Sequence, residues 1–331
     1  MSYTHSNHVH DIAFSGISRQ QENVFFVQIG AADGKRADPI SPFVKRYGWK
    51  GILVEPLPDL FELLQKNYHS QDGLIFENIA ITERDEVRKL TRIPMEKIGT
   101  RGVPGWAFGA SSLVPDKTRF AAQNSPAELH QALTSAAVEV SVNCISLQAL
   151  LDRHSVDTFD VLQLDTEGYD ANILRQLDFA RYRPTLINME WQWLTEQERL
   201  EVSGLLQENG YHLYPCEADM LATKIPVEEL SRMPDELSSD SVLKYFPGIV
   251  GLVSNIEISE DDAGCRSSPA RIDIARYRGQ QLPLTGAPGF FRLLTSIDGK
   301  QRIRDLASKV GCSDQQVIAW ARELQKVFVL D

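Results

Sequence analysis

The chain has 331 residues, of which 43% are hydrophobic and 24% are charged, and its formal net charge is -11. This composition is typical of a globular protein that buries a large core, and the length predicts one α/β domain with a smaller second domain. The acidic balance argues against binding to nucleic acid or to an anionic membrane, and no apolar run reaches the roughly eighteen residues that predict a membrane span.

Residues 1–18 are polar and are predicted to form a flexible N-terminus. Beyond them, buried apolar runs predict strands at residues 24–29, 51–54, 74–81, 159–164 and 185–189. The spacing of apolar residues predicts helices at residues 40–47, 57–67, 147–154, 171–177 and 195–208. Strands that alternate with helices predict an α/β fold, with a mostly parallel sheet and helices on both faces.

Two regions depart from this alternation. Residues 97–135 are rich in glycine and proline, which predicts an irregular insertion or lid. Residues 138–142 are predicted as an edge strand. Residues 211–214 and 221–224 are predicted to form a hairpin near the end of the larger domain, which spans residues 19–226.

The remainder of the chain has a different pattern. Residues 227–270 are acidic and polar, which is typical of a linker. The last domain, residues 271–331, contains three predicted helices and a closing strand, at residues 289–297, 303–310, 313–325 and 327–330. Short helices with one strand predict a small winged-helix-like domain.

Glycines and acids gather just after the predicted strands, where ligands bind in a parallel sheet. Gly30 lies in IGAADG, and a glycine there lets the backbone approach a ligand closely. This segment is not GxGxxG, so it gives little support for dinucleotide binding. Glu55 follows the second strand at the spacing expected of a ribose-binding carboxylate. The alternative is a solvated loop glutamate, but Pro56 and Pro58 fix the turn around it.

The segment LQLDTEGYD, residues 162–170, places three carboxylates at one strand end, and Glu190 follows the next strand. Such acids repel each other, which predicts compensation by a cation, a ligand or shared protons. A helix N-cap explains Asp170 alone. Asp165, Glu167 and Glu190 are therefore the candidate catalytic residues, as bases or orienting groups. They are also the candidate ligands of magnesium or calcium, a reading less favoured because no histidine joins them.

In order and spacing, the segments IGAADG, LVEPLP, NIAI, GASSL, FDVLQLDTEGYD, RPTLINMEW and GYHLY resemble the FkbM methyltransferase family. The resemblance implies a class I, Rossmann-like methyltransferase fold with S-adenosylmethionine as the methyl donor. It implies donor contacts at Gly30, Ala31, Asp33, Gly34, Glu55, Asn78, Ile79 and Asp165. It implies acceptor contacts at Ser111, Ser112 and Asp219. Members of the family usually methylate hydroxyl oxygens of sugars or natural products.

The C-terminal domain resembles PqqD-like winged-helix domains, which implies docking of a precursor peptide by strand addition. The alternative is a packing or dimerisation domain, so a homodimer is a further expectation. The four cysteines are far apart, which argues against a disulfide framework and predicts a cytoplasmic location.

Three functions follow from these patterns. The leading hypothesis is O-methylation of a natural product, sugar or modified peptide, with a small-molecule or peptide acceptor. The second is a methyltransferase of ribosomal peptide biosynthesis that recruits a leader peptide. The third is a non-catalytic protein that binds S-adenosylmethionine and a partner.

Overall fold

A computed structural model describes residues 6–114, 126–216, 218–230, 270–277, 280–286, 293, 296–297 and 301–324. The chain divides into two compact units, one formed by Ile17–Pro226 and the other by Met1–Gly16 together with Val227–Asp331. The first unit contains the sheet whose strand ends carry the predicted site.

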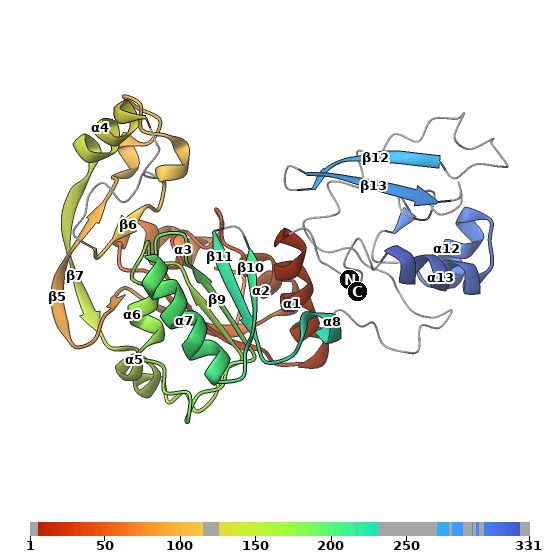
Figure 1. Ribbon diagram of the computed structural model, residues 1–331, viewed down its shortest axis with the longest axis horizontal. Helices are drawn as coiled ribbons and strands as arrows, with labels where there is room; N and C mark the ends of the chain where they lie inside the picture. The colour runs from red at the N-terminus through yellow and green to blue at the C-terminus, as the bar shows by residue number, and fades with distance from the viewer. Residues whose placement is uncertain are drawn as a thin grey trace. The chain divides into compact units, whose positions relative to one another are not determined.

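The large sheet consists of β1 (Phe25–Ile29), β2 (Lys50–Val54), β3 (Leu74–Glu77), β8 (Val161–Leu164), β9 (Leu186–Glu190), β10 (His212–Cys216) and β11 (Asp219–Thr223). Its strand order is β10-β11-β9-β8-β1-β2-β3 (Figure 1). The pairs β3–β2, β2–β1, β1–β8 and β8–β9 are parallel, whereas β11 runs antiparallel to both β9 and β10. The predicted mostly parallel sheet and the predicted hairpin are therefore confirmed.

The helices of this unit connect the strands and cover the sheet. They are α2 (Ser41–Tyr47), α3 (Pro58–Asn67), α5 (Leu147–Arg153), α6 (Asp170–Leu174) and α7 (Glu196–Glu208). The chain moves from β1 through β2 to β3 toward one edge, and from β8 to β9 toward the other. Right-handed crossovers consequently place α2 and α3 on one face and α6 on the opposite face, as predicted (Figure 1).

A second, four-stranded sheet has the order β4-β7-β5-β6. Its strands are β4 (Ala80–Ile81), β5 (Glu86–Arg92), β6 (Ser111–Ser112) and β7 (Val138–Ile145). The strand predicted at residues 74–81 is thus two strands, with β3 in the large sheet and β4 in the second. The edge-strand prediction for residues 138–142 is confirmed, because these residues pair only with β5, whereas Cys144 and Ile145 at the end of β7 also pair with β4.

The predicted irregular insertion, residues 97–135, contains more regular structure than its composition indicates. It includes η2 (Gly105–Ala107), β6 and α4 (Ala127–Ala136), and it begins at the end of η1 (Met95–Lys97); residues 115–125 lie outside the described part. Apolar side chains of this region form a small core of their own, made of Ile93, Val103, Ala107, Ala110, Leu133 and Ala136.

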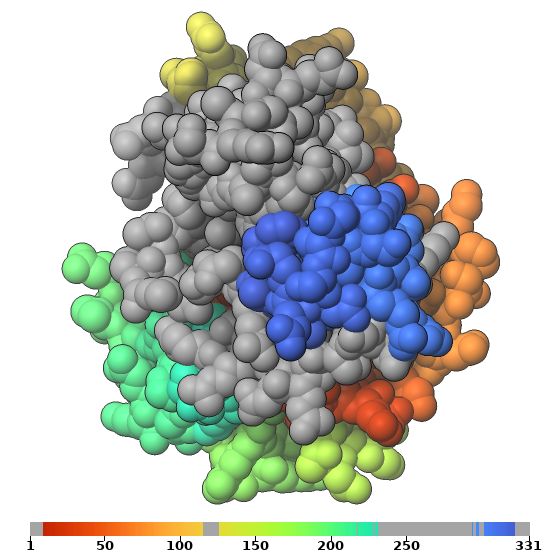
Figure 2. All heavy atoms as spheres, turned by 90° about the vertical axis from the view of Figure 1, so that its right-hand side faces the viewer, coloured from red at the N-terminus to blue at the C-terminus, as the bar shows by residue number. Residues whose placement is uncertain are grey.

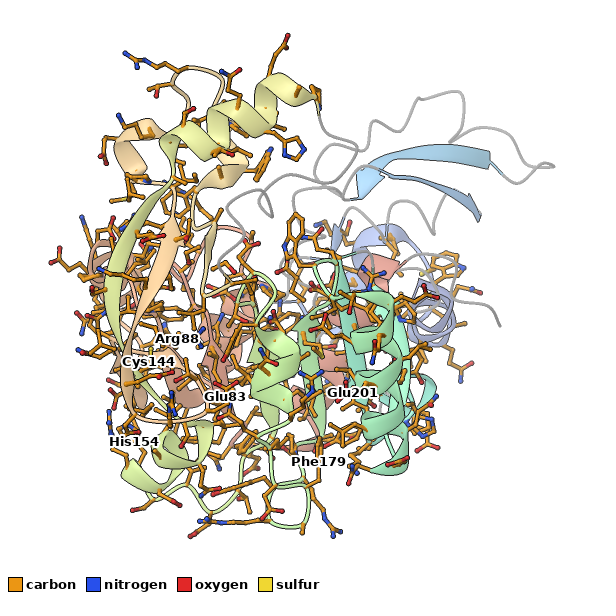
Figure 3. All side chains as sticks on the ribbon, turned by 60° about the vertical axis from the view of Figure 1, so that its left-hand side comes forward. Glu83, Arg88, Cys144, His154, Phe179 and Glu201 are labelled. Atoms are coloured by element: carbon orange, nitrogen blue, oxygen red, sulfur yellow. The ribbon has the colours of Figure 1, made fainter. Side chains whose placement is uncertain are left out.

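Polar contacts fasten the second sheet to the large one. Arg92 in β5 donates two hydrogen bonds to Asp59 in α3, at 2.6 and 2.7 Å. Tyr169, just before α6, donates to the Glu83 carboxylate at 2.7 Å and accepts from Arg88 at 3.0 Å (Figure 3). A bidentate arginine–carboxylate pair fixes orientation as well as distance.

The prediction of a flexible N-terminus over residues 1–18 is wrong for most of that range. Residues Ser6–Gln20 form helix α1. Its buried apolar residues are Val9, Ile12, Ala13, Phe14 and Ile17. The polar residues His10, Asp11 and Ser15 between them are buried as well, so the helix is covered on more than one face, which its polar sequence did not indicate. None of the helices in the described part of the chain is long and apolar enough to cross a membrane.

In the other unit, β12 (Ala270–Tyr277) and β13 (Gln280–Gly286) form an antiparallel pair. Helices α12 (Ile303–Val310) and α13 (Asp314–Leu324) lie side by side (Figure 1), and Figure 2 shows the residues of this region as one blue patch. Their buried apolar residues include Ile303, Leu306, Ala307, Val310, Val317 and Ala321.

These elements agree with the predicted helices at residues 303–310 and 313–325, whereas the β12–β13 pair was not predicted. The predicted linker, residues 227–270, begins with the short helix α8 (Val227–Leu230), and its residues 231–269 lie outside the described part. Most of the predicted helix 289–297 and the whole predicted strand 327–330 also lie outside it, so the winged-helix-like fold stays a prediction.

Candidate active site

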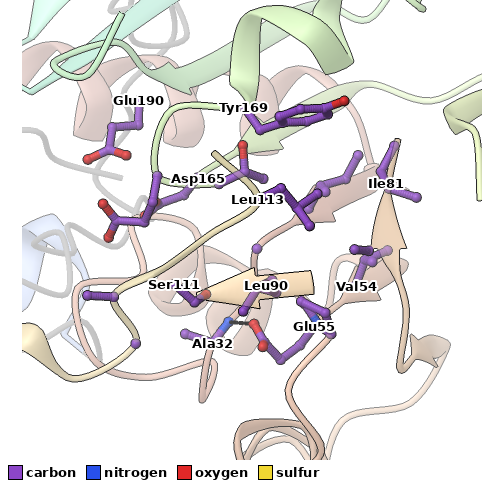
Figure 4. Close-up of a pocket in the computed structure, with 18 of the residues that line it drawn as sticks. Ala32, Val54, Glu55, Ile81, Leu90, Ser111, Leu113, Asp165, Tyr169 and Glu190 are labelled. Carbon is purple, nitrogen blue, oxygen red and sulfur yellow. Dashed lines mark hydrogen bonds between the residues drawn. The ribbon is translucent and has the colours of Figure 1, made fainter. Parts of the chain in front are cut away.

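The site lies where the strand order of the large sheet reverses. Strand β1 pairs with β2 on one side and β8 on the other, and Ile29 is in register with both Val54 and Leu164. The next residue of each strand therefore falls in one row along the carboxyl edge, which is the usual ligand-binding position in such sheets. A cavity of about 260 Å³ opens along this row (Figure 4).

Gly30 allows the first strand end to lie against the end of β8. Its φ is +84°, and a Cβ there would lie 1.8 Å from the carbonyl oxygen of Asp165. The backbone N–H of Gly30 donates to the carbonyl oxygen of Val54 at 3.0 Å, and that of Asp165 donates to Ile29 at the same distance. Only glycine fits this position without moving one of the strands.

Glu55 follows β2 and lies at the floor of the same cavity. One carboxylate oxygen accepts from the backbone N–H of Ala32 and the other from that of Leu57, each at 2.9 Å. The Glu55 side chain is only 3% exposed, and this burial raises its pKa to about 7. Each oxygen retains lone-pair capacity for a further donor, since a carboxylate offers about four acceptor sites.

The raised pKa of Glu55 makes stability depend on pH. The folded pKa of about 7 exceeds the ordinary value of 4.5. The neutral carboxyl therefore contributes to the free energy of unfolding, and this contribution is complete below about pH 4.5. It is lost as the pH rises through 7, where the free energy of unfolding falls by at most about 1.4 kcal/mol per pH unit. We expect Glu55→Gln to flatten this decline in urea unfolding measured from pH 5 to 7.5. The exposed control Glu62→Gln keeps the wild-type slope; parallel curves for Glu55→Gln and wild type would contradict the assignment.

Three carboxylates meet at the other end of the cavity. Asp165 and Glu167 follow β8, Glu190 ends β9, and one carboxylate oxygen from each lies within 4.8 Å of the others. Figure 4 shows Asp165 and Glu190 at the same end of the pocket. Burial raises the pKa of Asp165 and of Glu190 well above their ordinary values, and the neighbouring charges add to both shifts.

The loop that carries two of these acids is built around Asp170. Its carboxylate is fully buried and accepts from the backbone N–H groups of Thr166, at 3.1 Å, and Gly168, at 3.2 Å. Glu167 between them has a φ of +53°, a conformation that non-glycine residues adopt mainly where the surroundings impose it. Burial, aided by the charge of Asp170, raises the pKa of Glu167 to about 7.

The structure brings about half of the predicted site residues into the cavity wall. The residues that line it are Gly30, Glu55, Ile79, Ser111, Asp165, Glu167 and Glu190. The predicted residues outside the lining are Ala31, Asp33, Gly34, Asn78, Ser112 and Asp219.

The donor-loop residues outside the lining shape the loop instead. Ala31 is buried, and its backbone N–H donates to β2 at 3.0 Å. Asp33 accepts from the backbone N–H groups of Lys35, at 3.1 Å, and Arg36, at 2.9 Å. The carbonyl oxygen of Gly34 accepts from a serine of α2 at 2.8 Å. These contacts hold the turn.

The other three residues also have structural partners. Asn78 donates to the carbonyl oxygen of Glu55 at 2.9 Å and so holds the end of β2. Ser112 donates to the carbonyl oxygen of Glu167 at 2.8 Å. Asp219 accepts from the asparagine side chain of β9 at 3.1 Å.

Some lining residues had no signal in the sequence. Arg36 and Phe108 stack over each other, with 3.9 Å between the guanidinium carbon and the ring centroid. Trp106 is 55% exposed, and Tyr169 and Trp193 complete the aromatic part of the wall. Trp106 and Phe108 lie in the glycine-rich insertion, where no periodicity shows which side chains face inward.

Comparison with known proteins assigns this site to a family. The family model described as the methyltransferase FkbM domain matches residues 28–213, more than half of the chain. The chain belongs to the FkbM methyltransferase family. The family match begins within β1 and includes β2, β8 and β9, so all four strand ends of the cavity belong to the FkbM domain.

Two solved structures are similar to this FkbM chain. The methyltransferase FkbM from Methylobacillus flagellatus KT is 10% identical, with a TM-score of 0.37 over 61% of this chain and 44% of that one. The precorrin-6y C5,15-methyltransferase from Geobacter metallireducens GS-15 is also 10% identical, with a TM-score of 0.32 over 66% of this chain and 88% of that one. The chain thus covers less than half of the length of the first relative. No curated protein matches it significantly.

Proposed function

We propose that this FkbM chain is an S-adenosylmethionine-dependent methyltransferase that methylates a hydroxyl oxygen of a natural product, sugar or modified peptide. The observation that carries the proposal is one cavity, at the point where the strand order reverses, with Gly30 and Glu55 on one wall and an acidic cluster facing them. One wall of the cavity is therefore suited to bind the methyl donor, and the opposite wall carries groups that can accept a proton.

The donor half suits the adenosyl group of S-adenosylmethionine. The Glu55 carboxylate, fixed by two backbone N–H groups, has free acceptor capacity for ribose hydroxyls. Val54, Ile79 and Ile81 give the adjoining wall the apolar surface that a purine needs. Gly30 keeps the floor open, because a side chain there would collide with the end of β8.

When bound, S-adenosylmethionine supplies an already activated, electrophilic methyl group, so the chain's own residues mainly orient the acceptor and remove its proton. Asp165 and Glu167 are the candidates for this proton transfer. Burial raises the pKa of Asp165 well above its ordinary value and that of Glu167 to about 7, and a general base is most effective when its pKa is near the working pH. Ser111 of β6, together with Trp106 and Phe108 of the same insertion, forms the wall left for the acceptor.

The test is calorimetric titration of S-adenosylmethionine into wild-type protein and Glu55→Gln. We expect saturable binding to wild type and an affinity about ten- to a hundredfold lower for the variant, which corresponds to roughly 1.5–3 kcal/mol for hydrogen bonds to a charged group. Glu62→Gln, an exposed glutamate of α3, is the matched control and binds as wild type does. No binding to folded wild-type protein would reject the proposed function.

A further inference from the structure

We infer that Asp165, Glu167 and Glu190 form a binding site for one hard divalent cation of the magnesium or calcium type. Neither the family match nor the fold assigns a metal to this chain. The assignment depends on the positions, surroundings and chemistry of these three side chains.

The first argument is the fit of the three carboxylates around a single point. Asp165 and Glu190 follow positions that are in register on the neighbouring strands β8 and β9, and Glu167 turns back toward them. Their nearest oxygens lie within 4.8 Å of one another. Neighbouring ligand oxygens are about 3.0 Å apart around magnesium and about 3.3–3.7 Å apart around calcium, and opposite ones about 4.2 Å and about 4.6–5.2 Å apart, from the usual bond lengths. The three carboxylates are therefore close enough to converge on one cation by moving their side chains inward, and calcium needs less of this movement than magnesium.

The second argument is an oxygen with no partner. Glu190 belongs to a different strand from the other two acids and is only 7% exposed. Its Oε1 accepts from Gln192 at 2.5 Å, whereas its Oε2 has no hydrogen-bond partner among the described residues. Leaving a buried carboxylate oxygen unpaired is costly, and a cation in the adjoining cavity would satisfy it.

The third argument is the lack of a compensating positive charge. Within the described residues, no lysine, arginine or histidine forms an ion pair with any of the three acids. Arg36 lines the same cavity, but it lies 3.6 Å from Asp33 and stacks on Phe108. The carboxyl groups of Asp170 and Asp219 add further negative charge near Asp165.

The ligand chemistry selects the class of cation. All three ligands are carboxylates, and hard cations such as magnesium and calcium bind oxygen, whereas zinc prefers nitrogen and sulfur. In the sequence, the lack of a histidine among these acids favoured a direct acid–base role. Because hard cations bind oxygen rather than nitrogen, the same lack is equally consistent with a magnesium or calcium site. If the proposed function holds, an acceptor hydroxyl on this cation would lose its proton more readily.

The test is calorimetric titration of MgCl₂, CaCl₂ and ZnCl₂ into the full chain after removal of metal with EDTA, with the melting temperature as a second readout. We expect one magnesium or calcium ion per chain and a higher melting temperature when it is bound. Glu167→Gln and Glu190→Gln should each weaken binding by about tenfold or more. Glu201→Gln, an exposed glutamate paired with Arg175, is the matched control and binds like wild type.

Two results would overturn the cation site: no saturable binding of magnesium or calcium to wild type, or wild-type affinity in both variants. Glu167 is only half-buried, so Glu167→Gln provides the test even if Glu190→Gln does not fold. Titration of S-adenosylmethionine in EDTA separates this inference from the proposed function. Donor binding without cation binding rejects the metal alone, whereas cation binding without donor binding rejects the methyltransferase function alone.

Discussion

Asp165→Asn is expected to lower methyl transfer by about a hundred- to ten-thousandfold, the range that general acid–base catalysis contributes. The substitution keeps the size of the side chain but removes its negative charge from the acidic end of the cavity. The fold should persist, because Asp165 is crowded by Glu167, Asp170 and Asp219, whose charges together with burial raise its pKa. Removing one of these repelling charges is expected to leave the melting temperature unchanged or higher.

The rate is measured as transfer of a tritiated methyl group from S-adenosylmethionine. The acceptor is chosen by screening wild-type protein against hydroxylated natural products and sugars. Asp157→Asn is the matched control, because Asp157 is exposed in the loop that precedes the same strand. A wild-type rate in Asp165→Asn would show that this carboxylate takes no part in the reaction.

Gly30→Ala is expected to destabilise the chain by at least about 3 kcal/mol and to abolish binding of S-adenosylmethionine. The new methyl group would lie 1.8 Å from the carbonyl oxygen of Asp165, and the backbone would have to keep a φ of +84°. Backbone atoms cannot rotate away as a flexible side chain can, so the ends of β1 and β8 must separate. The measurements are urea unfolding and calorimetric titration of the donor.

Gly48→Ala separates the two causes of this loss. Gly48 ends α2 with a φ of +66°, and a Cβ there would have no neighbour within 4 Å. Gly48→Ala is therefore expected to lower the free energy of unfolding by about 1–2 kcal/mol, which is the cost of placing alanine in a left-handed backbone conformation. If Gly30→Ala were no more destabilising than Gly48→Ala, the close approach of β1 and β8 would not be important for stability.

The elements of the large sheet could be predicted because their signals are local. The apolar runs before Gly30, Glu55, Asp165 and Glu190 are continuous and flanked by turns, so both the strands and the residues at their carboxyl ends were evident. Helix α7 likewise lies where residues 195–208 were predicted to be helical, and a capping box between Thr195 and Glu198 fixes its start. Because neighbouring parallel strands end at the same edge of a sheet, the prediction of the strands was enough to predict that these residues lie together.

The second sheet could not be predicted, because its pairing is not local. Strand β5 reads EVRKLTR, whose charged residues hide its alternation, and its partner β7 lies beyond the whole insertion. The break at Asn78 depends on a side-chain hydrogen bond to Glu55, which no pattern of apolar residues reveals. The same limit explains why Asp33 and Ser112 were placed at the ligand: their partners are backbone groups that the sequence does not display.

The separate small core of the insertion bears on how this protein family can diversify. The donor wall of the cavity comes from the large sheet, whereas Trp106, Phe108 and Ser111 come from a region with its own small core. Substitutions in that region change the acceptor wall while leaving β1, β2 and β8 as they are. Under the proposed function, sequence drift between residues 93 and 113 would alter acceptor preference without rebuilding the half that would bind the donor.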